Sequence, residues 1–190
     1  IEVNMFRGVS PAEGWQRVYG GQVIGQALVA ASRTVEDESR VAHSLHGYFL
    51  RPGDTTIPIL YSVDRIRDGR SFNTRRVVAV QKGQAIFSMS VSFQVMEEGL
   101  HHQIDMPAGV KPPEECATEA ELRAAYIDKI PEEFKSNFER PRPIEMRFVE
   151  PINDFEPEPM SPYQNVWIKA ADAMPDDIRL NQCLLAYASD

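Results

Sequence analysis

Apolar side chains recur with a helical period near both ends of the chain. Over 20–32, one face gathers small or branched residues: Val23, Ala27, Ala30 and Ala31. Over 176–190, the same period is carried by Leu180, Cys183, Leu184, Tyr187 and Ala188. Pro175 and the two aspartates after it favour a helix start at that point. The pattern predicts one helix at each end, and the first allows close packing because its residues are small.

Between the two helices the period changes to that of β-strands. Four segments rich in bulky residues are bounded by turn residues: 43–51, 57–67, 71–81 and 84–97. Asp68-Gly69 and Lys82-Gly83 are signals for tight hairpins between consecutive strands. The pattern predicts an antiparallel meander that curls around the first helix. The lead-in before residue 20 is expected to be anchored by Phe6 and Trp15.

The second half of the chain begins with a shift toward proline and charged residues. A surface helix is expected at 118–130, and short strands at 144–149 and 164–170, before the terminal helix. The terminal helix repeats Leu, Ala and Ser of the first, since LVAAS at 28–32 aligns with LAYAS at 185–189. We therefore expect three parts: a first domain over 1–105, a linker with a helical segment over 106–140, and the start of a related second domain over 141–190.

Charge and cysteine usage narrow the range of partners. The 190 residues carry a net charge of −8, which disfavours general binding to nucleic acid. No run of apolar residues approaches the length of a membrane span, and no signal peptide is visible. Cys116 and Cys183 lie far apart and suggest reduced thiols. We expect a cytoplasmic protein that binds neither nucleic acid nor membranes.

The sequence resembles the acyl-CoA thioesterase II family over nearly its whole length. The resemblance is carried by GGQVIGQALVAA (20–31), HSLHGYFLRPGD (43–54), RDGRSFNTRRVVAVQKG (67–83), IFSMSVSFQ (86–94) and the stretch from VWIKA through PDDIRLNQCLLAYASD (166–190). It implies an α+β double hotdog fold, in which an antiparallel sheet wraps a long helix, with the second copy incomplete. It also implies hydrolysis of medium- to long-chain acyl-CoA to fatty acid and coenzyme A, without cofactor or metal.

Asp190 is the principal candidate for catalysis. It follows Cys183 by two helical turns and so falls within about 20° of the apolar stripe. By pattern alone it either ends the helix in solvent or places a carboxylate at the mouth of an active site. The resemblance implies that Asp190 is catalytic, because it ends the LLxYASD motif, and that its Thr and Gln partners lie on later strands outside this sequence. Residues 1–190 alone are then expected to be inactive.

Two further groups are candidates for substrate binding. Gly20, Gly21 and Gln22 can hold a carbonyl oxygen at the start of the first helix, or the glycines can simply permit a tight entry turn. Arg67 and Arg70 flank the Asp68-Gly69 turn and can hold the phosphates of coenzyme A, or they can be solvated residues of a hairpin. His43 and His46 are spaced to point to opposite faces of a strand, so no metal site is expected.

Other functions remain open at this point. A hotdog hydratase or dehydratase normally pairs Asp with His, but no Asp-x4-His spacing occurs. No GxSxG motif marks a serine nucleophile, and Cys183 has no histidine in its own helix. A non-catalytic module that binds CoA or lipid is the third alternative. Because hotdog sheets commonly pair at their edges, we expect a homo-oligomer.

Overall fold

The computed structural model describes residues 3–11, 17–132, 135, 141–153 and 155–190. The chain divides into two compact units. The first consists of Ile1–Gly99 together with Pro175–Asp190, and the second of Leu100–Met174. Of the two predicted anchors of the lead-in, Phe6 packs against the core of the first unit, whereas Trp15 lies outside the described residues.

A five-stranded antiparallel sheet forms the first unit. Its strands are β1 (Met5–Gly8), β2 (Arg40–Phe49), β3 (Ile59–Asp68), β4 (Phe72–Gln81) and β5 (Gln84–Val95). The four predicted strands are confirmed within a few residues, and β1 is an addition that pairs with β3. The order is β1-β3-β4-β5-β2. The predicted meander is therefore wrong at one place, because β2 pairs with β5 rather than with β3.

Gln81 fixes the crossover that carries the chain from β2 to β3. This buried side chain donates to the carbonyls of Asp54 and Ile57, both at 2.9 Å, and accepts from the amide of Asp54 at 2.8 Å. The crossover thus depends on a residue far along the chain. Local turn signals cannot reveal such a contact, which is why the sequence suggested a simple meander.

The two predicted hairpins form, with one difference in detail. Lys82 and Gly83 both adopt positive φ, at 49° and 73°, as a tight two-residue turn between β4 and β5 requires. At the other hairpin, the amide of Gly69 donates to the carbonyl of Phe72 at 2.9 Å. The chain therefore reverses at Arg70 and Ser71, slightly later than the Asp68-Gly69 signal suggested.

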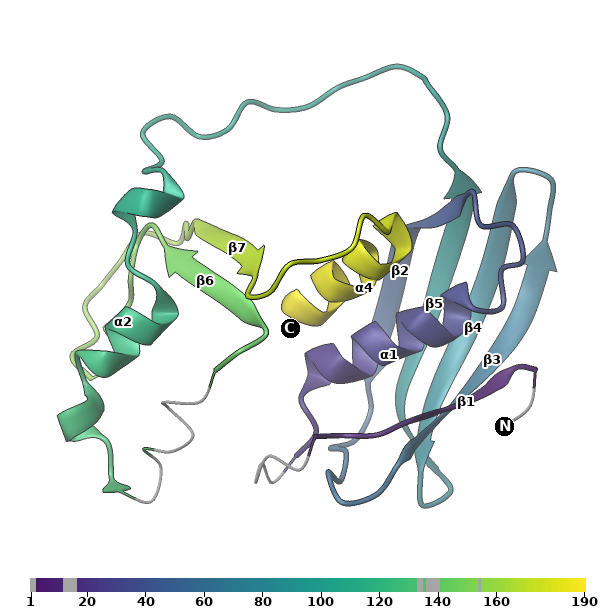
Figure 1. The fold of residues 1–190 in the computed structure, drawn as a ribbon, viewed down its shortest axis with the longest axis horizontal. Coiled ribbons are helices and arrows are strands. Elements are labelled where there is room, and N and C mark those ends of the chain that lie inside the picture. The colour runs from purple at the N-terminus through teal and green to yellow at the C-terminus, as the bar shows by residue number, and fades with distance from the viewer. Residues whose placement is uncertain (1–2, 12–16, 133–134, 136–140, 154) are drawn as a thin grey trace. The chain divides into compact units, whose positions relative to one another are not determined.

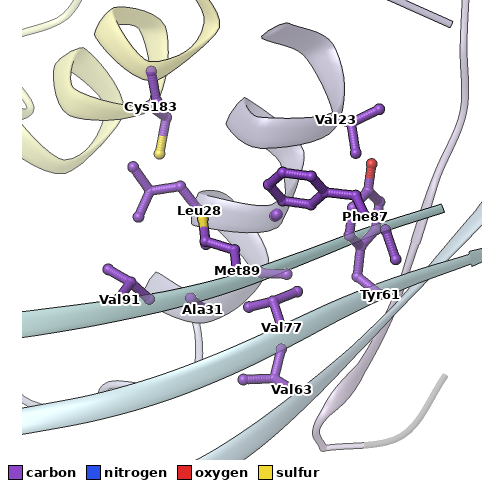
Figure 2. Packing of buried hydrophobic residues seen from close by; sticks show 14 of the residues in the cluster. Val23, Leu28, Ala31, Tyr61, Val63, Val77, Phe87, Met89, Val91 and Cys183 are labelled. Carbon is purple, nitrogen blue, oxygen red and sulfur yellow. The ribbon is translucent and has the colours of Figure 1, made fainter. Parts of the chain in front are cut away.

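Helix α1 (Gly20–Ser32) lies across one face of this sheet (Figure 1). Its apolar residues pack against inward-facing side chains of the strands, of which Figure 2 shows several: Tyr61, Val63, Val77, Phe87, Met89 and Val91. Tyr61 is buried, and its hydroxyl donates to Oε1 of Gln26 on the helix at 2.9 Å. A long helix held against an antiparallel sheet is the hotdog arrangement that the sequence predicted.

Helix α4 (Ile178–Ala188) runs antiparallel to α1 in the same unit. Asp177 caps its start by accepting from the amides of Arg179 and Leu180. Glycines of α1 allow the two backbones to approach: a Cβ on Gly21 would lie 2.1 Å from the Tyr187 carbonyl oxygen. Figure 2 shows Cys183 of α4 pointing toward Leu28 of α1. Only part of the predicted apolar stripe is buried, since Leu180 is 39% exposed.

Polar side chains at the start of α4 attach it to β2. The guanidinium of Arg179 donates to the carbonyls of Arg40 at 3.0 Å and Val35 at 3.2 Å. The amide of Gln182 pairs with both backbone groups of Ala42, donating at 2.6 Å and accepting at 3.1 Å. These bonds satisfy backbone groups at the edge strand and fix where α4 lies along the sheet.

The second unit is smaller and built around one hairpin. It contains η1 (Pro113–Glu115), α2 (Glu119–Ala124), η2 (Ile127–Lys129), β6 (Ile144–Phe148) and β7 (Val166–Ala170), with β6 and β7 antiparallel. Both predicted strands are confirmed. Thr118 and Glu121 form a capping box at the start of α2, but the helix is shorter than the predicted 118–130 and continues as η2. The domain boundaries at residues 105 and 140 stay predictions.

Candidate functional site

A cleft in the first unit brings the last residue, Asp190, to the beginning of α1. Its volume is about 400 Å³. Apolar side chains form most of its wall, and two arginines and Asp190 supply the charge. The lining residues are Arg17, Val18, Gly20, Val23, Phe49, Leu50, Arg51, Pro52, Gly53, Ile86, Phe87 and Asp190. The cleft thus combines an apolar surface with a carboxylate and two guanidinium groups.

Asp190 and Gly20 are in direct contact across this cleft. A Cβ at position 20 would lie 2.7 Å from Oδ1 of Asp190 and 2.7 Å from Cζ of Phe49. Only glycine therefore leaves room for the carboxylate at this point. Asp190 follows the C-cap residue Ser189, whose hydroxyl donates to the Ala186 carbonyl at 2.7 Å. Asp190 is exposed and lines the cleft.

The start of α1 carries no side-chain cap. The N-cap residue Tyr19 makes no hydrogen bond to the first-turn amides; its hydroxyl instead donates to the Tyr187 carbonyl at 3.2 Å. The two tyrosine rings meet edge to face, with centroids 5.0 Å apart. The first-turn amides have no partner within the helix and lie at the positive end of its dipole. They can therefore donate to an oxygen that carries developing negative charge.

The other two residues of the predicted carbonyl site have roles in packing. Gly21 allows the close approach to Tyr187 described above. The side-chain amide of Gln22 donates to the hydroxyl of Ser10 at 3.0 Å and holds the lead-in segment against α1. Gly21 and Gln22 can therefore contact a substrate only through their backbone amides.

Arg67 and Arg70 lie at the opposite end of α1 from Asp190. The carbonyl of Arg67 accepts from Arg75, which also binds Thr34 just beyond the end of α1. The carbonyl of Arg70 accepts from Arg40 at 2.8 Å. A helix of 13 residues spans about 20 Å, so these arginines are not brought together with the carboxylate. The arginines that line the cleft are Arg17 and Arg51. The sequence pattern did not indicate either of them as a binding residue, although Arg51 belongs to the stretch HSLHGYFLRPGD.

Histidines and acidic residues form no metal site in the part of the chain that the structure describes. His43 is within 2.8 Å of the Ser92 hydroxyl, and His46 stacks edge to face on Tyr48.

Within the described ranges, no helix is long and apolar enough to cross a membrane.

The second unit holds a larger cavity, of about 610 Å³, between α2 and β6. Its charged groups are all paired: Glu119 accepts from Arg123 at 2.6 Å and from Arg142 at 3.0 Å, and Glu145 accepts from Arg147 at 2.7 Å. No carboxylate at this cavity corresponds to the exposed Asp190. The smaller cleft is therefore the better candidate for chemistry.

Comparison with known proteins shows the family to which the chain belongs. Residues 11–94 match the family described as the acyl-CoA thioesterase N-terminal domain, and residues 134–190 match the acyl-CoA thioesterase family. Over all 190 residues the chain is 41% identical to acyl-CoA thioesterase 2 of Haemophilus influenzae. The chain belongs to the acyl-CoA thioesterase family. The first match contains β2 to β4 and nearly all of β5, and the second contains α4 with Asp190.

Solved structures of thioesterases and other hotdog proteins show the same fold. An acyl-CoA thioesterase II, TesB2, from Mycobacterium marinum is 40% identical and superposes on the whole chain with a TM-score of 0.71. A hotdog protein from Alicyclobacillus acidocaldarius, 17% identical, gives a TM-score of 0.71 and confirms the hotdog fold. The chain spans just under two thirds of its thioesterase relatives: 66% of the Haemophilus protein and 64% of TesB2.

Proposed function

We propose that the full-length protein that contains residues 1–190 hydrolyses medium- to long-chain acyl-CoA to free fatty acid and coenzyme A, with Asp190 as the catalytic residue. The observation that carries the proposal is the contact between Asp190 and Gly20 at the uncapped start of α1. The identity of 41% to an acyl-CoA thioesterase supports the same class of reaction. Thioester hydrolysis needs a group that activates water and donors for the oxyanion, and both are available at this contact.

In the proposed reaction, the Asp190 carboxylate accepts a proton from a water molecule as the oxygen of that water attacks the thioester carbonyl. The carbonyl oxygen becomes an oxyanion and accepts from the first-turn amides at Gly20 and Gly21. Collapse of this intermediate breaks the carbon–sulfur bond and releases the fatty acid. The thiolate of coenzyme A leaves and takes up the proton from Asp190 or from solvent. The apolar residues Val23, Phe49 and Phe87 line the same cleft as Asp190 and suit an acyl chain.

A cysteine nucleophile is a poor alternative. Cys183 is 7% exposed, and burial, with a smaller effect from the Asp177 carboxylate, raises the pKa of its thiol to about 11. A thiol with this pKa is almost entirely protonated at neutral pH, and the protonated form is a weak nucleophile. Direct attack by water therefore fits the site better than a covalent intermediate.

The test is release of free thiol from a series of acyl-CoAs by the full-length protein and by its Asp190→Asn variant. Loss of one general base typically lowers kcat by about a hundredfold or more. Asp176→Asn is the matched control, because it makes the same change in charge at an exposed position at the other end of the same helical segment. Parent-like turnover by Asp190→Asn would reject this role for Asp190. Binding of CoA without turnover of any acyl chain would instead favour a non-catalytic binding module.

The proposal extends to the setting of the enzyme. Both cysteines are free and buried, which suits a reducing compartment such as the cytoplasm. The expected partner is the acyl-CoA substrate in fatty acid metabolism, rather than a nucleic acid or a membrane. A homo-oligomer is also proposed, and light scattering of the full-length protein in solution would test it.

A further inference from the structure

Two arginines stand at the cleft that holds Asp190. Arg17 and Arg51 both line it, and both side chains are exposed. They come from segments far apart in sequence: Arg17 precedes α1, and Arg51 follows β2. The 190 residues together carry a charge of −8. The two positive charges beside the candidate catalytic carboxylate are therefore opposite in sign to the net charge.

Backbone contacts fix where the two arginines lie. The amide of Val18, next to Arg17, donates to the carbonyl of Gly53 at 3.0 Å, and this bond joins the two segments. The amides of Leu50 and Arg51 both donate to the carbonyl of Ile86, at 2.8 and 3.2 Å. The guanidinium of Arg51 uses one nitrogen to donate to the Ala85 carbonyl at 2.7 Å. Arg51 is thereby oriented, while its remaining N–H groups are available to a ligand.

Neither guanidinium is neutralised by an acidic side chain among the described residues. The acid nearest to Arg51 in sequence, Asp54, is already engaged: Thr56 and Lys82 both donate to its carboxylate, and the Thr56 bonds are the larger cause of its lowered pKa. Several other arginines of this unit are paired, as Arg76 is with Asp64 at 2.6 Å. Arg17 and Arg51 are therefore free to bind a partner other than the acidic side chains that the structure describes in this unit.

Guanidinium groups bind phosphate through paired hydrogen bonds, and coenzyme A presents phosphates at the end away from its thioester. We infer that Arg17 and Arg51 bind the phosphates of the CoA portion of the substrate, while the apolar wall of the cleft receives the part near the thioester. This inference rests on the proposed function. It assigns the role suggested by sequence for Arg67 and Arg70 to a different pair of residues, because only Arg17 and Arg51 share the cleft with Asp190.

The first experiment compares two substrates that share an acyl group. One is acyl-CoA, and the other is the acyl thioester of N-acetylcysteamine, which has the thioester but no phosphate. Arg17→Gln and Arg51→Gln should each raise KM for acyl-CoA about tenfold, the effect of one lost charge-assisted contact, with little change in kcat. Neither variant should change kcat/KM for the phosphate-free substrate. Arg76→Gln, an exposed arginine outside the cleft, is the matched control.

The second experiment measures binding without catalysis. Calorimetry of free coenzyme A with the parent should show that the affinity falls as salt is added. The Kd of the Arg17→Gln variant should be about tenfold higher than that of the parent. Thermal unfolding of each variant separates lost binding from lost folding, which matters for Arg51 because of its bond to Ala85.

The two experiments distinguish failure of this inference from failure of the proposed function. Turnover by the parent with an equal loss for both substrates in the arginine variants would overturn phosphate binding and leave the hydrolase intact. Salt-sensitive CoA binding that depends on Arg17, without turnover, would uphold the phosphate site and reject hydrolysis. Loss of CoA affinity in Arg67→Gln/Arg70→Gln but not in Arg17→Gln would overturn the inference in favour of the hairpin, and so would a parent that does not bind CoA.

Discussion

The carboxylate of Asp190 occupies the space that a methyl group on Gly20 would need. A Cβ at position 20 would lie 2.7 and 2.8 Å from the two carboxylate oxygens, closer than such atoms approach in proteins. The contact joins the end of the segment containing α4 to the first residue of α1. The catalytic proposal therefore depends on a glycine as much as on an aspartate.

Gly20→Ala should lower activity while leaving the fold largely intact. Alanine favours the helix, but its methyl group has to displace both the Asp190 carboxylate and the Phe49 ring. A displacement of about 1 Å at a catalytic group can reduce kcat by about a hundredfold. Steady-state hydrolysis and thermal unfolding should be measured together. Gly99→Ala is the control, because no atom lies within 4 Å of a Cβ there. Parent-like kcat in Gly20→Ala would contradict the proposed contact.

Gly21→Ala should destabilise the protein more than Gly25→Ala. Both glycines face α4, but a Cβ at 21 would lie 2.1 Å from the Tyr187 carbonyl oxygen, whereas a Cβ at 25 would lie 3.3 Å from the Cys183 carbonyl oxygen. In Gly21→Ala the backbone of α4 at Tyr187 has to move away, whereas in Gly25→Ala a slight shift at Cys183 is enough. We expect a loss of about 1–3 kcal/mol in the free energy of unfolding for Gly21→Ala, and less for Gly25→Ala. Urea denaturation measures both, and equal losses would show that the helices separate easily.

Two adjacent arginines should differ sharply in their effect on stability. The side chain of Arg75 is 1% exposed and donates to Thr34 and to Asp68, the latter at 2.5 Å, whereas that of Arg76 is 54% exposed. Removal of a buried charged partner leaves unsatisfied polar groups and costs about 3–5 kcal/mol, whereas exposed ion pairs contribute at most about 1 kcal/mol. Arg75→Ala should therefore unfold at much lower urea concentration than Arg76→Ala. Similar midpoints would mean that solvent reaches Arg75 in the native state.

Much of this fold could be predicted from local pattern, and the parts that could not depend on distant contacts. Bulky residues bounded by turn signals predicted β2 to β5. Strands β3 and β4 also bury alternate residues over most of their length, whereas β2 is largely exposed. The pairing of β2 with β5 could not be predicted from these patterns, since it is set by contacts such as that of Gln81 with Asp54 and Ile57. Strand β1 is too short, at four residues, to show a period.

The residues of the candidate site could also be predicted only in part, because local pattern does not reveal which distant residues meet. Asp190 and Gly20 were both selected from sequence, one by motif and one as a helix start, but nothing local indicated that they touch. Arg17 and Arg51 were missed because neither belongs to a charge cluster; they share a cleft only after the backbone bond between Val18 and Gly53 forms. Arg67 and Arg70 attracted attention as neighbours in sequence, although they lie at the other end of α1.

Acid should destabilise the protein partly through Asp68. The hydrogen bond from Arg75 is the largest cause that lowers the pKa of Asp68 below its ordinary value of 3.8. Burial opposes it to a smaller extent, and the hydrogen bond from Asn73 adds a lowering that is smaller still. A carboxyl whose pKa is lower in the folded state stabilises that state above the unfolded pKa. This contribution is lost as the pH falls through the folded pKa. The free energy of unfolding of the parent should therefore exceed that of Asp68→Asn at pH 6, and the difference should shrink steadily below pH 3.8.

Urea titrations of both proteins between pH 6 and pH 2 give this comparison. Asp105→Asn serves as a control for the charge change, because Asp105 is exposed and forms no ion pair with any described residue. A difference between parent and Asp68→Asn that stays constant over the whole range would show that the Asp68 bond does not depend on its ionisation.

Cys183 should react slowly with thiol reagents and should not be needed for hydrolysis. Its thiol is buried between the helices, and burial raises its pKa to about 11, so little thiolate exists at pH 8. Native protein should therefore be modified far more slowly than protein in 8 M urea, as followed by absorbance with a chromogenic disulfide. Cys183→Ala should keep most of the parent kcat, with a modest loss of stability from the small cavity. If the Cys183→Ala variant folds but no longer hydrolyses acyl-CoA, the result would contradict Asp190-assisted attack by water and favour a mechanism with Cys183 as nucleophile.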